Sequence, residues 1–227
     1  MTEREALLEA VLAAPADDAP RLVYADWLDE HGEPAQAAFI RAQLELARQK
    51  PDTAEHDRVT ESLLDLWDRF LAELRPAVPS DLMLLPSDFR RGFPATAIQL
   101  PQVSAFRDQS PFWWPRLPIR AVSVDLTPWN VGEFVRVPYL ARVRELVLIG
   151  EDPHGKVIPR LVRCHYLENL RVLDLSQFPF SEEAAEALAG TEVFRNVAEL
   201  RLPYSFRPNR GIARKLRERY GDDVCRF

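Results

Sequence analysis

Glycine is scarce in this chain, with 8 among 227 residues, about 3.5% against an average of roughly 7%. The glycines stand at positions 32, 92, 132, 150, 155, 190, 211 and 221. Neither the dinucleotide-binding pattern G-x-G-x-x-G nor the phosphate-binding pattern G-x-x-x-x-G-K-[ST] therefore occurs. These two types of glycine-loop nucleotide site are excluded.

Cysteine is scarcer still, and long apolar runs are missing. Cys164 and Cys225 form neither a C-x-x-C site nor a disulfide framework, and the four histidines form no H-E-x-x-H pattern. No uninterrupted apolar run approaches 18 residues, and the first ten residues lack the basic and apolar regions of a signal peptide. We therefore expect a cytoplasmic protein with reduced thiols, without a metal or other cofactor.

Recognisable catalytic motifs are also missing. The sequence has no G-x-S-x-G elbow and no set of kinase motifs. Cys164 stands next to His165, which suggests a thiol nucleophile, but adjacent side chains on a helix usually diverge and a buried structural cysteine is commoner. We therefore expect a protein that is not an enzyme.

The overall composition is that of a globular protein, with 47% hydrophobic and 28% charged residues, but the charge is uneven. Residues 1–86 hold 8 basic and 18 acidic residues, a net charge of −10. The remaining residues hold 21 basic and 17 acidic residues, a net charge of +4. This difference suggests two modules of different surface chemistry.

The N-terminal part has the pattern of a small helical bundle. Thr2 followed by Glu5 predicts a capping box at the start of a first helix, which the prolines at 15 and 20 end. Asp17 or Asp18 is expected to cap a second helix that stops before Gly32, and a third begins at about Pro34. Residues 51–75 predict a fourth helix, followed by a proline-rich connector to residue 86.

The segment R-L-V-Y-A-D-W-L-D-E-H-G, residues 21–32, resembles the short bacterial repeat-companion domain. The resemblance covers about residues 1–50 and implies that repeats follow, but it implies no reaction. Asp26 and Glu30, four residues apart, could form a cation-binding edge, but we expect a solvated helix face, because no second cluster of ligands accompanies them. Tyr24 and Trp27 fit packing better than a ligand cage.

Residues 87–227 contain an internal period. Short apolar runs end at leucines 100, 126, 148, 175 and 202, which gives spacings of 26, 22, 27 and 27 residues. A short L-x-L strand in each unit of 20–29 residues resembles leucine-rich repeats, and the resemblance covers about residues 90–220. It implies an α+β repeat solenoid, in which the helical bundle is followed by a short arc of βα units with a parallel sheet.

The segments between the strands are expected to form outer helices, at 133–143, 158–167, 181–190 and 211–220. The repeats are irregular, because the usual asparagine position holds Trp129, Glu151, Phe178 and Ser205. The sequence therefore predicts a short, irregular arc of four or five strands. The chain is expected to divide into three regions: a helical domain 1–50, a bridging helix and connector 51–86, and the leucine-rich-repeat-like domain 87–227, which holds the arc. Phe112, Trp113 and Trp114 are expected to cap the first repeat, with a recognition role as the alternative.

Side chains that alternate with the buried leucines are predicted to line the concave face of the sheet. The partner-binding candidates are Gln99, Ser123, Asp125, Glu145, Val147, Asp174, Glu199 and Arg201. Their mixed chemistry favours a protein partner, which predicts a scaffold or adaptor; the alternative is a solvated face. A further alternative is nucleic-acid binding by basic residues near the C-terminus, namely Arg207, Arg210, Arg214, Lys215 and Arg217.

Overall fold

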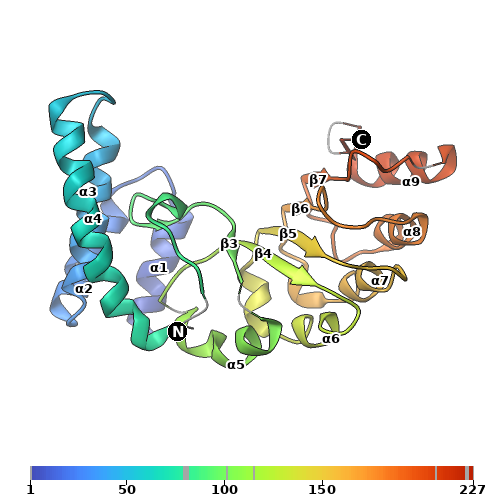
Figure 1. The fold of residues 1–227 in the computed structure, drawn as a ribbon, viewed down its shortest axis with the longest axis horizontal. Coiled ribbons are helices and arrows are strands. Elements are labelled where there is room, and N and C mark those ends of the chain that lie inside the picture. The colour runs from blue at the N-terminus through green and yellow to red at the C-terminus, as the bar shows by residue number, and fades with distance from the viewer. Residues whose placement is uncertain are drawn as a thin grey trace. The chain divides into compact units, whose positions relative to one another are not determined.

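A computed structural model describes residues 2–78, 82–100, 102–114, 116–207, 209–222 and 225–226, with the backbone alone for residues 77, 112, 113, 225 and 226. The chain has two compact units, whose elements are labelled in Figure 1. The first unit is Met1–Ser80, Leu84–Ala95 and Phe112–Pro118. The second is Asp81–Met83, Thr96–Pro111 and Ile119–Phe227. The predicted α+β class is confirmed.

The first unit is mainly helical, and the predicted helices are confirmed. Its elements are α1 Glu3–Ala13, α2 Ala19–Glu30, α3 Pro34–Arg48, α4 Ala54–Leu74, η1 Arg75–Ala77, η2 Pro86–Asp88, β1 Phe89–Arg90 and β2 Phe93–Pro94. The Glu5 amide donates to the Thr2 hydroxyl, and the Thr2 amide donates to the Glu5 carboxylate, so the capping box is present. Asp18 is the N-cap residue of α2 but makes no side-chain cap bond; Asp17 instead accepts from the Ala19 amide.

Two groups of buried side chains hold the first unit together. The rings of Phe39, Trp67, Phe70 and Phe89 pack with centroids 5.1–5.8 Å apart. Such contacts add to the stabilisation from burying apolar area. The second group consists of Leu8, Val11, Tyr24, Ala25, Leu28, Ala37, Ile40, Leu44 and Phe93. The first group thus joins α3 to α4, and the second joins α1, α2 and α3.

The β1–β2 hairpin supplies one ring to each group, Phe89 to the first and Phe93 to the second. Its two-residue turn is Arg91-Gly92, with φ angles of 51° and 85°. Positive φ at both positions is the requirement of a type I′ turn. The Gly92 amide donates to the side-chain oxygen Oε1 of Gln43 at 2.7 Å, which fastens the turn to α3.

The second unit is a parallel sheet with its strands in chain order, from β3 to β8 within the described part. The strands are β3 Ile98–Gln99, β4 Ala121–Leu126, β5 Glu145–Gly150, β6 Val172–Asp174, β7 Glu199–Arg201 and β8 Cys225–Arg226. The helices are α5 Val103–Trp113, α6 Val131–Phe134, η3 Pro138–Arg142, α7 Val157–Leu161, η4 His165–Leu167, α8 Glu182–Gly190 and α9 Arg210–Tyr220. In Figure 1, α6, α7, α8 and α9 follow one another along one side of the strands.

The predicted alignment of one strand is wrong by two residues. Leu126 was expected to correspond to Leu100 and Leu148, but Val122 pairs with both Ile98 and Leu146, so Val124 takes that position. The positions in register are Ile98, Val122, Leu146, Leu173 and Leu200. The spacings are therefore 24, 24, 27 and 27 residues, more regular than predicted.

Two of the expected outer helices are also shorter than predicted. Residues 133–143 form the end of α6 and then η3, and residues 158–167 form most of α7 and then η4. Pro138 starts the 3₁₀ turn η3, because proline removes a backbone donor and fixes φ. Helices α8 and α9 match their predicted ranges within a residue. Among the described residues, no helix is long and apolar enough to cross a membrane.

Candidate binding surface

On β3, β4, β5 and β7 the side chains predicted to line the exposed sheet face alternate with buried ones, whereas Asp174 on β6 is itself buried next to Leu173. In β4, Val122, Val124 and Leu126 are buried, whereas Ser123 is half-buried and Asp125 is exposed. The in-register row across the sheet is Gln99, Ser123, Val147, Asp174 and Arg201. Glu145 and Glu199 belong to the neighbouring row.

Asp125 does not belong to the row predicted for it. The strand register pairs it with Ile149, two residues further along β5 than Val147. The cause is the two-residue error in the alignment of β4. Asp125 nevertheless stays on the outward side of the strand, because side chains alternate with period 2.

Arg201 gathers the carboxylates of this face around one guanidinium. It lies 3.0 Å from Asp174, 2.8 Å from Glu199 and 3.8 Å from Glu145. The second carboxylate oxygen of Asp174 accepts from the Ser176 amide at 2.9 Å. Three strands thus contribute to one ion-pair network, and the polar groups that the sequence placed on the face stabilise one another.

The network changes the acidity of Asp174, which is only 8% exposed. Burial opposes ionisation, but hydrogen bonds from Ser176 and Arg201 outweigh it and hold the pKa of Asp174 below its ordinary value. Hydrogen bonds to Glu199 and Asp174 raise the pKa of Arg201. Arg201 pairs with Glu145, Asp174 and Glu199, and Asp125 lies outside this network. These four acidic residues and Arg201 carry a formal net charge of −3.

Replacing Arg201 with Met tests the network. We expect a loss of about 1 kcal/mol in the free energy of unfolding at pH 7, because Asp174 stays buried without its cationic partner. Because the pKa of Asp174 is depressed in the folded state, its ionised carboxylate stabilises the fold above about pH 4. This stabilisation is lost as the pH falls through the folded-state pKa. The difference from the wild type should therefore shrink at pH 3, as measured by urea unfolding.

Arg214→Met serves as the control for that experiment. Its partner Glu218 is 3.5 Å away and both side chains are at least 67% exposed, so the expected change is below about 0.5 kcal/mol. A loss for Arg201→Met that is equally large at pH 3 and pH 7 would assign its effect to packing and not to the ion pairs.

The basic residues predicted for nucleic acid lie around α9, and acidic partners accompany most of them. Lys215 lies 3.6 Å from Glu186, Arg214 lies 3.5 Å from Glu218, and Arg217 lies 3.5 Å from Asp222. Arg207 lies over the Tyr204 ring, 5.1 Å from its centroid. Together with Ala213, Glu218 and Asp222, the side chains of Arg210, Arg214 and Arg217 line a groove of about 480 Å³. The α9 surface is therefore mixed in charge.

Cys164 and His165 do not form a nucleophile and base pair. Cys164 is 3% exposed and its thiol donates to the Val135 carbonyl at 3.3 Å, whereas His165 is exposed and its ring contacts Tyr166. Burial raises the pKa of the Cys164 thiol, which is the opposite of what activates a cysteine. Cys164 therefore has the properties of a structural side chain.

The side chains of residues 24–32 in the first unit take part in ring stacking and ion pairs. The Trp27 ring stacks between those of Tyr24, 6.0 Å away, and His31, 3.9 Å away. Asp26 and Asp29 each contact Arg41 at 2.7 Å. Among the described residues, no group of three or more His, Cys, Asp or Glu side chains is arranged to hold a metal ion.

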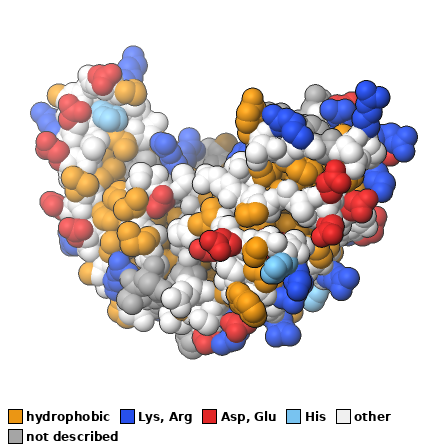
Figure 2. All heavy atoms as spheres, turned by 45° about the vertical axis from the view of Figure 1, so that its right-hand side comes forward, with side chains coloured by type: hydrophobic (Ala, Val, Ile, Leu, Met, Phe, Trp, Pro, Cys, Tyr) orange, Lys and Arg blue, Asp and Glu red, His pale blue; other side chains and the backbone are white. Residues whose placement is uncertain are grey.

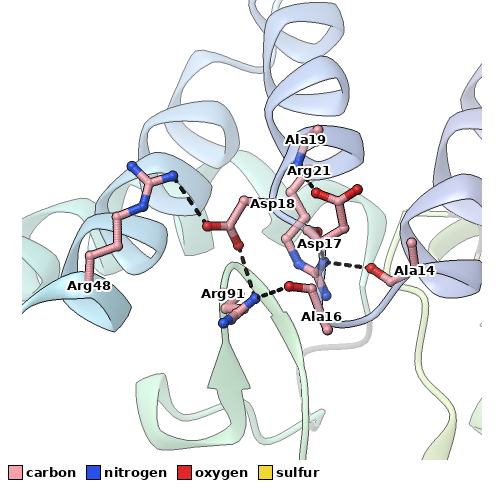
Figure 3. Close-up of polar contacts among 8 residues, drawn as sticks. All are labelled: Ala14, Ala16, Asp17, Asp18, Ala19, Arg21, Arg48 and Arg91. Carbon is pink, nitrogen blue, oxygen red and sulfur yellow. Dashed lines mark hydrogen bonds and ion pairs between the residues drawn. The ribbon is translucent and has the colours of Figure 1, made fainter.

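Arginines also fasten the loop before α2 to the β1–β2 hairpin (Figure 3). Arg91 of the hairpin donates to the Ala16 carbonyl at 2.8 Å and to Asp18 at 3.0 Å. Asp18 also pairs with Arg48 at 3.2 Å, and Arg21 donates to the Asp17 carbonyl at 2.6 Å. Arg21, which begins the segment 21–32, is thus a structural residue.

The aromatic run predicted as a cap is described only in part. Trp114 is fully buried and belongs to the first unit. The side chains of Phe112 and Trp113 lie outside the described part of the structure.

A pocket that the sequence analysis did not predict lies after the carboxyl ends of β4 and β5. Its volume is about 400 Å³, and it is lined by Thr127, Pro128, Trp129, Glu151, Pro153, His154, Lys156 and Arg160. Trp129 is 92% exposed. The sequence signal was the presence of Trp129 and Glu151 where asparagine was expected.

Comparisons with protein-family models, curated proteins and solved structures find no match for this chain.

Proposed function

We propose that the second unit is a leucine-rich-repeat-type recognition module that binds a partner protein on its exposed sheet face. The observation that carries the proposal is the in-register row of outward side chains on the sheet, together with the ion-pair network around Arg201. A regular, rigid face of this kind presents a fixed arrangement of charges and apolar contacts, which favours specific recognition.

The charge of the face indicates what it binds. Across β3–β7 the candidate residues carry a net charge of −3, which repels nucleic-acid phosphates and complements a basic surface. The neutral side chains Gln99, Ser123 and Val147 lie next to the acidic side and provide area for desolvated contact. We therefore propose that the partner presents Lys and Arg side chains around a less polar centre.

In this proposal the protein is a non-enzymatic adaptor that needs no cofactor. The partner protein supplies any signalling or catalytic activity. The first unit fits a repeat-companion module that supports the repeats or contacts a second protein. The buried free thiol of Cys164 fits a reducing compartment such as the cytoplasm.

Asp125→Lys tests the face most directly, because Asp125 is exposed and lies outside the Arg201 network. The tagged full chain captures partners from its native lysate after nuclease treatment, and binding of the captured protein is then measured with purified components. We expect Asp125→Lys to weaken that binding at least tenfold, because it lowers the net negative charge from −3 to −1 and places a Lys against the basic side chains of the partner. Reversal of Asp174 or Arg201 would be less informative, since it would also break the network.

Glu168→Lys is the matched control, because it makes the same change of charge on a side chain that is 55% exposed and lies outside the face. It should change binding less than twofold. Equal affinities for the wild type and Asp125→Lys, with both folded by circular dichroism, would exclude the sheet face as the binding site. Capture that disappears with nuclease and depends on Arg210 and Arg214 would favour the nucleic-acid alternative.

A further inference from the structure

The pocket beside Trp129 has walls that are fixed in place by hydrogen bonds. Asn130 accepts from the Thr127 amide at 2.8 Å and donates to the Asp125 carbonyl at 3.0 Å, and the Trp129 amide donates to the Thr127 hydroxyl at 3.3 Å. The loop that carries the exposed indole is therefore held in one conformation. These hydrogen bonds fix the backbone that carries the indole, and an aromatic side chain with two χ angles loses little conformational entropy on binding.

The opposite wall is equally fixed. Asp152 is 7% exposed, and its carboxylate accepts from the amides of Lys156 and Val157 at 2.7 and 2.8 Å. Arg160 donates to the Pro128 carbonyl at 2.7 Å, which joins this wall to the Trp129 loop. The two loops thus form one prearranged site, whose volume of about 400 Å³ lies in the range of ligand pockets.

The charges of the pocket differ from those of the sheet face. Lys156, Arg160 and the His154 imidazole line it together with one carboxylate, that of Glu151. Within the described residues, none of these four side chains takes part in an ion pair, in contrast to Lys215, Arg214 and Arg217 around α9. On the side of the second unit that faces the viewer in Figure 2, hydrophobic side chains lie next to Lys, Arg and His side chains.

We propose that this pocket binds a short acidic peptide segment of a partner protein, with an apolar side chain against Trp129 and a carboxylate against Lys156 and Arg160. A guanidinium already held near an indole meets a carboxylate without rearrangement, and Trp and Arg are the residue types that contribute most at binding sites. The proposal rests on the recognition role of the second unit and adds a second site with the opposite charge preference.

Selection from a phage-displayed library of random 12-residue peptides tests the pocket. The full chain is the target, and the double variant Trp129→Ala/Arg160→Glu is used to remove peptides that bind elsewhere. We expect the enriched peptides to carry Asp or Glu next to an apolar residue. Synthetic peptides of the enriched sequences, followed by fluorescence anisotropy, should bind Trp129→Ala and Arg160→Glu at least tenfold more weakly than the wild type.

Two matched variants distinguish the pocket from general surface effects. Tyr204→Ala removes another exposed aromatic ring, which is 82% exposed, and Arg163→Glu reverses an exposed charge three residues from Arg160. Both should bind the peptides within twofold of the wild type. Circular dichroism should show that all four variants are folded.

Other results would overturn the proposal. These are the absence of enriched peptides, enriched peptides without acidic residues, or equal affinity for the pocket variants and the wild type. Peptides that lose affinity with Asp125→Lys but not with Trp129→Ala would overturn the pocket while supporting the sheet face. A 20-nucleotide single-stranded DNA that binds in a Trp129-dependent manner and displaces the peptide would assign the pocket to nucleic acid instead.

Discussion

Replacing Gly92 with Ala is expected to lower the free energy of unfolding of the first unit by about 3 kcal/mol, through added strain and a steric clash. Gly92 has φ of +85°, and a Cβ atom there would lie 2.5 Å from the Ile40 Cγ1 atom and 2.7 Å from its Cα atom. Because the Cα atom belongs to the backbone of α3, a side-chain rotation cannot relieve the contact. The hairpin must therefore move away from α3.

That displacement would reach both groups of buried rings. Phe89 and Phe93 flank the turn on either side, and each packs into a different group. The hydrogen bond from the Gly92 amide to Gln43 would also lengthen. Hydrogen exchange measured by mass spectrometry should show faster exchange in α3 and in the hairpin, because local stability governs the opening of these amides.

Gly32→Ala separates the two causes. Gly32 has φ of +80°, but no heavy atom lies within 4 Å of the position a Cβ atom would take. It should therefore show only the backbone strain, about 1 kcal/mol. A loss for Gly92→Ala no larger than that for Gly32→Ala would contradict the steric explanation.

The helices could be predicted because their signals are local. Thr2 and Glu5 cap α1 through contacts three residues apart, and Pro34 starts α3 at a position where its missing amide costs nothing. The hairpin could not be predicted in the same way. Its turn places the non-glycine residue Arg91 at φ of 51°, and that conformation depends on contacts with Gln43 and Asp18, distant in sequence.

The alignment error in β4 has a simple physical cause. Val122, Val124 and Leu126 all point inward, so a shift of two residues leaves every side chain on its own side of the sheet. The hydrophobic pattern alone therefore does not distinguish the two registers. Backbone pairing with β3 and β5 does, since Val122 lies opposite Ile98 and Leu146.

The candidate sites could likewise be predicted only where they depend on local sequence pattern. Alternation within a strand was enough to place Ser123, Glu145 and Asp174 on the outward side. It did not indicate that Arg201 joins carboxylates from three strands, because that depends on register. The Trp129 pocket was missed because Arg160 and Trp129, 31 residues apart in the chain, line one pocket only after their two loops are joined by the hydrogen bond from Arg160 to the Pro128 carbonyl.

Raising the pH from 8 to 11 is expected to cost the first unit about 1.4 kcal/mol through Tyr24 alone, approaching about 2.7 kcal/mol above pH 12. Tyr24 is fully buried between Trp27 and Phe93. Burial raises its pKa to about 12 from an ordinary value near 10, although the nearby charge of Arg4 opposes this.

The sign follows from which state keeps the proton. Between pH 10 and pH 12 the unfolded chain has lost the phenol proton while the folded chain retains it. The stability that the protonated Tyr24 phenol contributes is therefore fully present below pH 10, and it is lost as the pH rises through the folded-state pKa. The measurement is urea unfolding of the full chain at pH 8 and pH 11, with hydrogen exchange to assign the transition to the first unit.

Tyr24→Phe should remove this part of the alkaline loss, because phenylalanine fills nearly the same space and has no proton to release. At pH 8 the variant should lie within about 1 kcal/mol of the wild type, since the stacking ring is kept. Tyr204→Phe, in the second unit and 82% exposed, should leave the alkaline loss of the first unit unchanged. An equal loss for the wild type and Tyr24→Phe would show that other groups, and not the buried phenol, make the first unit sensitive to alkali.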